Sequence, residues 1–310
     1  MARRRQLPAH LPEGQRSIDT GTVELEGDPD RPGGVMVYVN GVESSYVDLD
    51  DPRHLEFEYM QQMLLAMEDV LADPAPRILH LGGAACAFAR TIHALQPQAR
   101  QLVVELDGAL ARFAREWFDL PRSPALRIRV GEARESLEAM AGSWDVVVRD
   151  AFAGARVPEH LTTVEFLAHV EAHLAPDGLY LGNLVDTPPL PVARREVATA
   201  REVFAHVALA VEPPILKGRR FGNLVVVASQ QPLDEARLTR RLLALPAPVR
   251  LVVGKELDTF AGTAAPLRDG EPVVAPAPLR DGPPLDGATA DGATADGATA
   301  DGAAVGEPVA

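Results

Sequence analysis

The stretch RILHLGGAACAFARTIHALQPQARQLVVELD, residues 77–107, decides the fold class of this chain. It opens with an apolar run at 77–82, turns through Gly82 and Gly83 into a helix-like segment, and closes with a second apolar run at 101–106. A strand, a helix and a second strand of these lengths are typical of a βαβ unit, in which the two strands run parallel. The crossover between such strands is almost always right-handed. We therefore predict that a parallel α/β sheet begins here.

The same alternation continues towards the C-terminus. Apolar runs at 126–130, 144–150 and 178–185 are separated by helix-like segments, and two last runs, HVALAV and GNLVVVAS, are joined by a glycine-containing connection that allows an antiparallel pair. Strands that alternate with helices favour a mostly parallel sheet. The pattern predicts an α/β, Rossmann-like domain over residues 54–262, with seven strands in its sheet.

A small β-hairpin unit is predicted over residues 17–53, before this domain. Gly33-Gly34 and Asn40-Gly41 are turn signals between short strand-like runs. Residues 54–72 then place apolar side chains at helical spacing, which predicts one helix with a single buried stripe. The first segment, 1–16, is expected to be a flexible N-terminus.

The C-terminal part of the chain has a low-complexity composition. The sequence DGATA occurs three times within 286–300, and no aromatic residue follows Phe260. A five-residue period without large apolar side chains cannot bury a core, so 263–310 is predicted to be a disordered tail. Residues 264–310 carry eight acids and two bases, a net charge of −6, which leaves −8 for the other 263 residues.

Composition excludes several classes of protein. The 310 residues include 30 Lys and Arg against 44 Asp and Glu, a net charge of −14, which argues against a general nucleic-acid binder. The single cysteine, Cys86, cannot form an internal disulfide and fits a reducing cytoplasm. No apolar run approaches the roughly 18 residues of a membrane span, and the basic start lacks the apolar region of a signal peptide. We expect a cytoplasmic protein without a membrane partner.

Candidate site residues stand where the predicted strands end. Gly82 and Gly83 follow the first strand, Glu105 ends the second, and Glu132 and Asp150 close the next two. The carboxyl ends of parallel strands meet at one edge of a sheet, where open α/β sheets bind ligands. An acid about 20 residues after a glycine turn can accept both hydroxyls of a ribose. The set predicts a nucleoside site.

These residues also have simpler structural interpretations, which stay open. Gly82-Gly83 can be a close-packed turn, and Asp150 can cap a loop. Glu132 can complement the dipole of the helix that follows it, although its carboxylate and the backbone of Ala133 could instead face an adenine ring.

Two further polar features have mainly structural interpretations. Asp107 is expected to be the N-cap of the next helix. His169 and His173 lie four residues apart on one helix, but no H-E-x-x-H pattern or cysteine pair accompanies them, so no metal site is predicted.

From about Val39 to Ser229 the chain resembles the spermidine synthase superfamily, and in particular the bacterial spermidine-synthase-like proteins. These proteins share the Rossmann-like fold of the S-adenosylmethionine-dependent methyltransferases. The segments that carry the resemblance are NGV at 40–42, EFEYMQQML at 56–64, RILHLGG at 77–83, VVELD at 103–107, VGEAR at 130–134, WDVVVRDAF at 144–152, VPEHLTTVEF at 157–166, LAPDGLYLGN at 174–183 and GRRFGN at 218–223.

The resemblance implies a role for each candidate residue. Glu105 would bind ribose, Glu132 would face adenine, and Asp150 would be the base that deprotonates the acceptor amine. Tyr59 would line the acceptor side. The implied co-substrate is decarboxylated S-adenosylmethionine or S-adenosylmethionine itself, the acceptor is a polyamine or another amine, and no metal is needed. The resemblance also implies a homodimer formed through the N-terminal hairpins.

Two departures from the family pattern concern positions that hold cationic amines. Ala85 stands in the glycine-rich turn where aminopropyltransferases usually carry an Asp, and Ala153 stands where a second acid usually follows the catalytic Asp150. An unpaired buried ammonium costs several kcal/mol. Three hypotheses therefore stay open: aminopropyl transfer, methyl transfer from S-adenosylmethionine to an unidentified small molecule, and ligand binding without catalysis.

Overall fold

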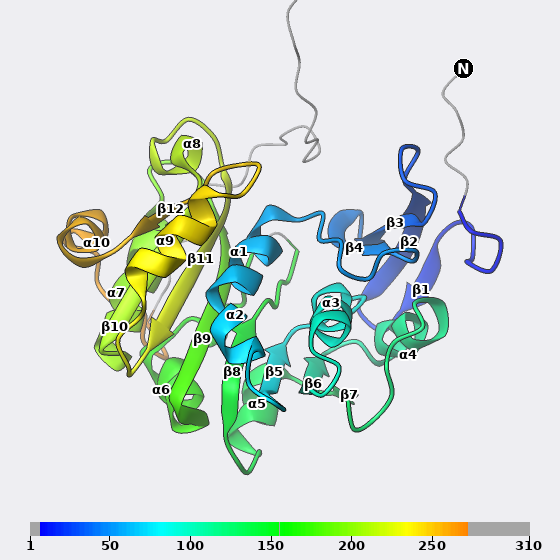
Figure 1. The fold of residues 1–310 in the computed structure, drawn as a ribbon, viewed down its shortest axis with the longest axis horizontal. Coiled ribbons are helices and arrows are strands. Elements are labelled where there is room, and N and C mark those ends of the chain that lie inside the picture. Colours follow the sequence, from blue (N-terminus) through cyan, green and yellow to red (C-terminus); the bar gives the residue numbers. More distant parts are fainter. Residues whose placement is uncertain (1–6, 155, 272–310) are drawn as a thin grey trace, which may run out of the picture. The chain divides into compact units, whose positions relative to one another are not determined.

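The computed structural model describes residues 7–154 and 156–271 (Figure 1). An antiparallel sheet of four strands in the order β1-β2-β3-β4 comes first. Its strands are β1 Arg16–Ile18, β2 Gly21–Gly27, β3 Gly34–Val39 and β4 Val42–Asp48. The predicted turn at Asn40-Gly41 joins β3 to β4, and both residues have positive φ angles, 53° and 77°, as a tight hairpin turn requires.

The large sheet that follows confirms the predicted Rossmann-like class. Its order is β12-β10-β11-β9-β8-β5-β6-β7, and the pairs from β9 to β7 are parallel, whereas β11, β10 and β12 pair antiparallel. The strands are β5 Arg77–Leu81, β6 Arg100–Glu105, β7 Leu126–Val130, β8 Trp144–Arg149, β9 Leu174–Asp186, β10 His206–Val211, β11 Gly222–Ser229 and β12 Arg250–Val252. The described sheet has eight strands instead of the predicted seven, because the three-residue strand β12 is too short to show a period in the sequence.

Helices cover both faces of this sheet. They are α1 Glu58–Ala66, α2 Glu68–Leu71, α3 Ala87–Leu95, α4 Gly108–Trp117, α5 Ala133–Glu138, a 3₁₀ helix Glu159–Leu161, α6 Val164–Ala172, α7 Pro191–Val203, α8 Pro213–Leu216, α9 Glu235–Leu243 and α10 Gly254–Ala261. The single helix predicted over 54–72 is instead two, because Met67 leaves the helical conformation between α1 and α2. Within the described residues, no helix combines the length and the apolar character needed to cross a membrane.

The core follows the alternation of the strands. In β8, Val147 packs with Leu167 of α6 and Leu257 of α10 in one cluster. Its neighbours Val146 and Val148 point to the other face, where α1 and α9 lie along the sheet (Figure 1). Strands buried on both faces are expected to be continuously apolar. Arg149, at the end of β8, is an exception to this rule, because it is a charged residue that is fully buried.

The folded part of the chain is longer at both ends than the sequence predicted. Leu11, within the segment expected to be flexible, is buried against the N-terminal sheet. Leu267, within the predicted tail, is also buried; its N–H donates to Thr199 Oγ1 and its carbonyl accepts from the N–H of Val164, both at 2.8 Å. Residues 263–271 therefore pack on α6 and α7, while the DGATA repeats and the rest of 272–310 lie outside the described residues.

Candidate active site

The main chain brings the predicted strand ends together at one edge of the sheet. The N–H of Gly82 donates to the carbonyl of Val104 and that of Asp150 to the carbonyl of Leu81, both at 2.9 Å. The N–H of Gly131 donates to the carbonyl of Glu105 at 3.0 Å. The turns after β5, β6, β7 and β8 are thus neighbours, as the parallel topology predicts.

The glycine turn is shaped by close packing. Gly82 has a φ of +94°, and a Cβ placed there would lie 2.3 Å from the carbonyl oxygen of Asp150. A Cβ on Gly83 would lie 2.3 Å from Cγ1 of Val103. No side chain fits at either position without movement of its neighbours. The structure thus supports the simpler interpretation of a close-packed turn, and this turn fixes the main chain of Asp150 beside it.

Glu105 ties the glycine turn to the end of β6. Its Oε2 accepts from the N–H groups of Gly83, at 3.1 Å, and Ala84, at 2.8 Å, while Oε1 accepts from the N–H of Asp107 at 3.0 Å. Burial raises the pKa of this carboxyl despite these hydrogen bonds. Each carboxylate oxygen has two lone pairs, so Oε2 is fully occupied while Oε1 can still accept one hydroxyl group from a ligand.

Asp107 has the structural role that its position predicts. Its Oδ1 accepts from the N–H of Leu110 at 2.7 Å and so caps α4. Its Oδ2 accepts from the N–H and the hydroxyl of Thr20, at 2.6 and 2.8 Å. One carboxylate thereby joins the N-terminal sheet to a helix of the large domain.

Asp150 and Tyr59 meet although 91 positions separate them in the chain. The Tyr59 hydroxyl on α1 donates to Asp150 Oδ2 at 2.9 Å, and the Asn183 amide on β9 donates to Oδ1 at 2.8 Å. The side chain of Phe57 stacks on Tyr59 with ring centroids 5.9 Å apart. Burial raises the pKa of Asp150, although both hydrogen bonds and the charge of Arg149 oppose the shift. Asp150 and Tyr59 both keep part of their surface exposed.

A buried ion pair lies directly behind Asp150. Arg149, with no exposed side-chain surface, donates from Nη1 and Nη2 to the two carboxylate oxygens of Glu196 on α7, at 3.1 and 2.7 Å. Its Nη2 also donates to the carbonyl of Asn183 at 3.0 Å. The sequence prediction missed Arg149, Glu196 and Asn183. The sequence did contain a signal: Arg149 and Asn183 stand in otherwise apolar strands, and a buried polar side chain needs a hydrogen-bond or charge partner.

Glu132 stands somewhat apart from this group. Its Oε2 accepts from the N–H of Glu135 at 2.8 Å, so it is the N-cap of α5, and its Oε1 lies 2.9 Å from His160 Nε2. Burial favours a higher pKa for Glu132, but the Glu135 and His160 hydrogen bonds outweigh it, and the pKa is lowered. The adjacent Ala133 is buried in the core. The structural interpretation of Glu132 therefore accounts for its contacts here.

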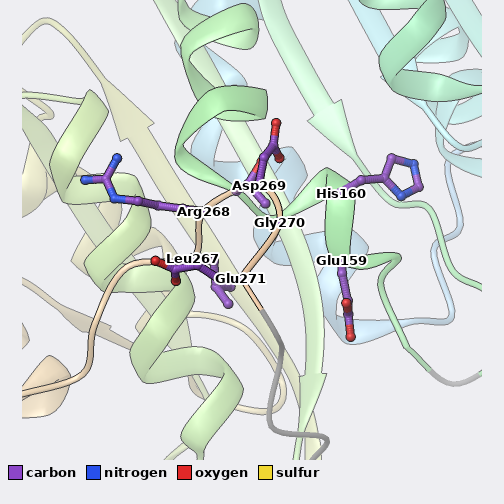
Figure 2. A pocket seen from close by; sticks show the side chains of 8 residues that line it. Glu159, His160, Leu267, Arg268, Asp269, Gly270 and Glu271 are labelled. Atoms are coloured by element: carbon purple, nitrogen blue, oxygen red, sulfur yellow. The ribbon is translucent and has the colours of Figure 1, made fainter.

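His160, in the 3₁₀ helix, also lines a pocket of about 420 Å³ (Figure 2). The rest of the lining consists of Glu159, Thr163 and the C-terminal segment 267–271. In that segment Asp269 forms two hydrogen bonds with Arg134, at 2.8 and 2.6 Å. Asp150 and Glu105 do not line this pocket, so it is separate from the cluster of strand-end acids.

The two positions that depart from the family pattern have different surroundings. Ala85 has no exposed surface and packs in the core beneath the N-terminal sheet. Ala153 is exposed in a turn, where its N–H donates to the carbonyl of Arg156 at 2.8 Å. No acidic side chain is present at either position to hold an ammonium group.

The histidines behave as structural residues in the described part of the chain. The two ring nitrogens of His173 lie 2.8 and 3.1 Å from the carbonyls of His169 and Met140. The N-cap of α6 is Thr163. Within residues 7–154 and 156–271, no group of three or more His, Cys, Asp or Glu side chains is arranged to hold a metal ion.

The chain is similar to a solved structure over most of its length. The crystal structure of a probable spermidine synthase from Corynebacterium glutamicum is 40% identical, covers 86% of this chain and 99% of its own, and has a TM-score of 0.79. No family model matches the chain.

Curated relatives match a shorter region. A polyamine aminopropyltransferase of Vibrio vulnificus is 31% identical over 163 residues, 51% of this chain and 52% of its own. One of Chromobacterium violaceum is 29% identical over 140 residues, 45% of this chain and 53% of its own. The match thus spans about half the length of these curated relatives. Because the identity is 40% over 99% of the Corynebacterium glutamicum protein, this chain belongs to the spermidine synthase family.

Proposed function

We propose that the chain is a transferase that moves an aminopropyl group from decarboxylated S-adenosylmethionine to a polyamine or a related amine. The observation that carries the proposal is the carboxylate of Asp150, held between the Tyr59 hydroxyl and the Asn183 amide at the carboxyl end of β8. The names of the relatives support this class of reaction.

Asp150 has the position and the chemistry of a general base. An alkylamine with a pKa of about 10 is protonated at neutral pH and cannot attack until it loses a proton. Asp150 takes this proton, the amine nitrogen bonds to the carbon next to the donor sulfonium, and the carbon–sulfur bond breaks with its electron pair on sulfur. Burial raises the pKa of Asp150, which makes its carboxylate a stronger base than an exposed one.

Glu105 is proposed to bind the ribose of the donor. Three main-chain N–H groups hold the carboxylate still, and the free lone pair on Oε1 is left for a ribose hydroxyl. A fixed acceptor loses little entropy when the ligand binds. Glu132 and the backbone of Ala133 are proposed to face the adenine, and Tyr59 to line the acceptor side of Asp150.

Methyl transfer is a second candidate, and one observation favours it. The buried Ala85 replaces the acid that would hold the donor's amine, so the donor tail lacks the charge partner expected for a decarboxylated donor. S-adenosylmethionine, with its carboxylate retained, would then be the donor and a small molecule the acceptor. A homodimer formed through the N-terminal sheet also remains a proposal.

Calorimetry with the two donors, followed by turnover assays, tests these candidates. We expect the full chain to bind decarboxylated S-adenosylmethionine more tightly and to form a labelled polyamine from putrescine. Asp150→Asn should keep donor binding but lose about 10²–10⁴-fold in turnover. Asp145→Asn, at the opposite end of β8, is the matched control and should stay active.

Two other outcomes would each indicate a different function. Tighter binding of the carboxylated donor, with methylation of an added amine, would replace aminopropyl transfer by methyl transfer. Donor binding without any turnover, unchanged in Asp150→Asn, would mean a ligand-binding protein that does not catalyse.

A further inference from the structure

We propose that Asn223, the last residue of the GRRFGN segment, is a positioning residue that acts on Asp150 through Asn183. The catalytic role of Asn223 rests on the proposed function, whereas the hydrogen bonds that join Asn223 to Asn183 and Asn183 to Asp150, called the relay below, do not. Asn223 Nδ2 donates to Asn183 Oδ1 at 3.0 Å, and Asn183 Nδ2 donates to Asp150 Oδ1 at 2.8 Å. Asn223 lies on β11 and Asn183 on β9, and Asp150 directly follows β8; these three strands are adjacent.

The direction of this relay follows from its ends. An ionised carboxylate can only accept hydrogen bonds, so Asn183 must turn its NH₂ group towards Asp150. Its carbonyl oxygen then points the other way and needs a donor, which the NH₂ group of Asn223 supplies. Without Asn223, the Asn183 oxygen would lose its donor, and the amide could rotate so that its hydrogen bond to the carboxylate weakens. Asn223 therefore keeps the donor of Asn183 on Asp150.

The main chain of Asn183 is held separately from its side chain. Arg149 donates to the Asn183 carbonyl while Glu196 binds the same guanidinium group. The backbone position of Asn183 thus does not depend on Asn223, whose contact fixes only the rotation of the amide.

Few other groups act on the Asp150 carboxylate. Among the described residues, the charged or titratable groups that act on it are Tyr59 from α1 and Arg149 from β8, and Arg149 is itself paired with Glu196 of α7. None of them is in the Asn183–Asn223 relay. We therefore expect a change in the pKa of Asp150 after substitution of Asn223 to pass through Asn183.

Carbon-13 NMR of the aspartate carboxyl groups in the full chain, without substrate, measures this directly. Loss of a hydrogen bond to the ionised form raises a carboxyl pKa. We expect Asn223→Leu to raise the pKa of Asp150 by about 0.5–1 unit, and Asn183→Leu by about one unit or more. Asp150→Asn assigns the signal. Ser229→Ala, which removes a polar side chain from the other end of β11, should leave the pKa unchanged.

A double variant decides whether Asn223 works through Asn183. In the Asn183→Leu background, Asn223→Leu should shift the Asp150 pKa by less than half of its effect in the unmodified chain. An unchanged pKa in Asn223→Leu, or an equal shift in both backgrounds, overturns the relay.

Because these titrations need no turnover, the relay and the proposed function can fail separately. If the chain transfers an aminopropyl group, the pH at which kcat reaches half of its maximum should move upward in Asn223→Leu with the measured pKa. A changed KM with an unmoved pH profile would instead mean that Asn223 binds substrate, which would also overturn the proposal.

Discussion

Removal of the Glu196 carboxylate should destabilise the protein by about 3–5 kcal/mol, because it leaves the Arg149 charge buried and unpaired. The Arg149 side chain is 0% exposed and that of Glu196 6%, so water cannot replace the lost partner without opening the core. Arg149 Nε already has no hydrogen-bond partner, and the carbonyls of Leu161 and Asn183 and the hydroxyl of Tyr180 would be the remaining partners of the guanidinium group. A loss of this size is a large part of the roughly 5–15 kcal/mol that stabilises a typical domain.

Urea unfolding of Glu196→Ala, followed by circular dichroism, measures this loss. Glu202→Ala is a matched control on the same helix, since Glu202 pairs with Arg268 at the surface, where both side chains are more than 40% exposed. Both variants gain the same alanine in α7, so helix propensity cancels. We expect Glu202→Ala to cost less than about 1 kcal/mol.

A paired replacement separates the unpaired charge from lost packing. Arg149→Met combined with Glu196→Leu removes both charges and keeps apolar volume, which should recover most of the stability lost in Glu196→Ala. If Glu196→Ala were no less stable than Glu202→Ala, or the paired replacement no more stable than Glu196→Ala, the argument from the buried charge would be refuted.

Three further perturbations test other parts of the structure. Gly82→Ala should lower the free energy of unfolding by at least about 1–3 kcal/mol, and by more than Gly41→Ala. Both glycines have positive φ, but only at Gly82 would the new Cβ meet a carbonyl oxygen, and the midpoints of urea unfolding measure the difference. Leu267→Ala should cost about 2–4 kcal/mol, measured as a lower melting temperature; no change would mean that segment 263–271 adds no stability. Glu105→Gln should weaken donor binding about tenfold or more in calorimetry. Since burial raises the pKa of Glu105, wild-type affinity should fall as the pH is lowered towards the ordinary glutamate value of about 4.3, whereas a flat wild-type profile would contradict ribose binding by the carboxylate.

The sequence predicted those features that follow from local periodicity. The alternation of strands and helices from 77 to 150 placed Gly82, Glu105 and Asp150 at one sheet edge because parallel strands end together, and hydrogen bonds in the structure connect these turns. The N-cap at Asp107 was predictable because capping depends only on neighbouring residues.

Features that depend on distant contacts were not predicted. Glu196 lies 47 residues from Arg149, and no local signal links them. Strand β12 forms only because β10 offers it an edge. Leu267 is buried by α6 and α7 although its neighbours have the composition of a tail. In each case tertiary packing, which a sequence period does not encode, determined the outcome.

The carboxylate of Asp107 has a consequence for how the protein unfolds. It caps α4 through Leu110 and holds Thr20 of the N-terminal sheet at the same time. If the contact with Leu110 or the contact with Thr20 is lost, the Asp107 carboxylate keeps only part of its hydrogen bonds and is held less firmly. Fraying of α4 and release of the N-terminal sheet should therefore promote one another. The two sheets should therefore exchange their slowest amide protons as a single cooperative unit.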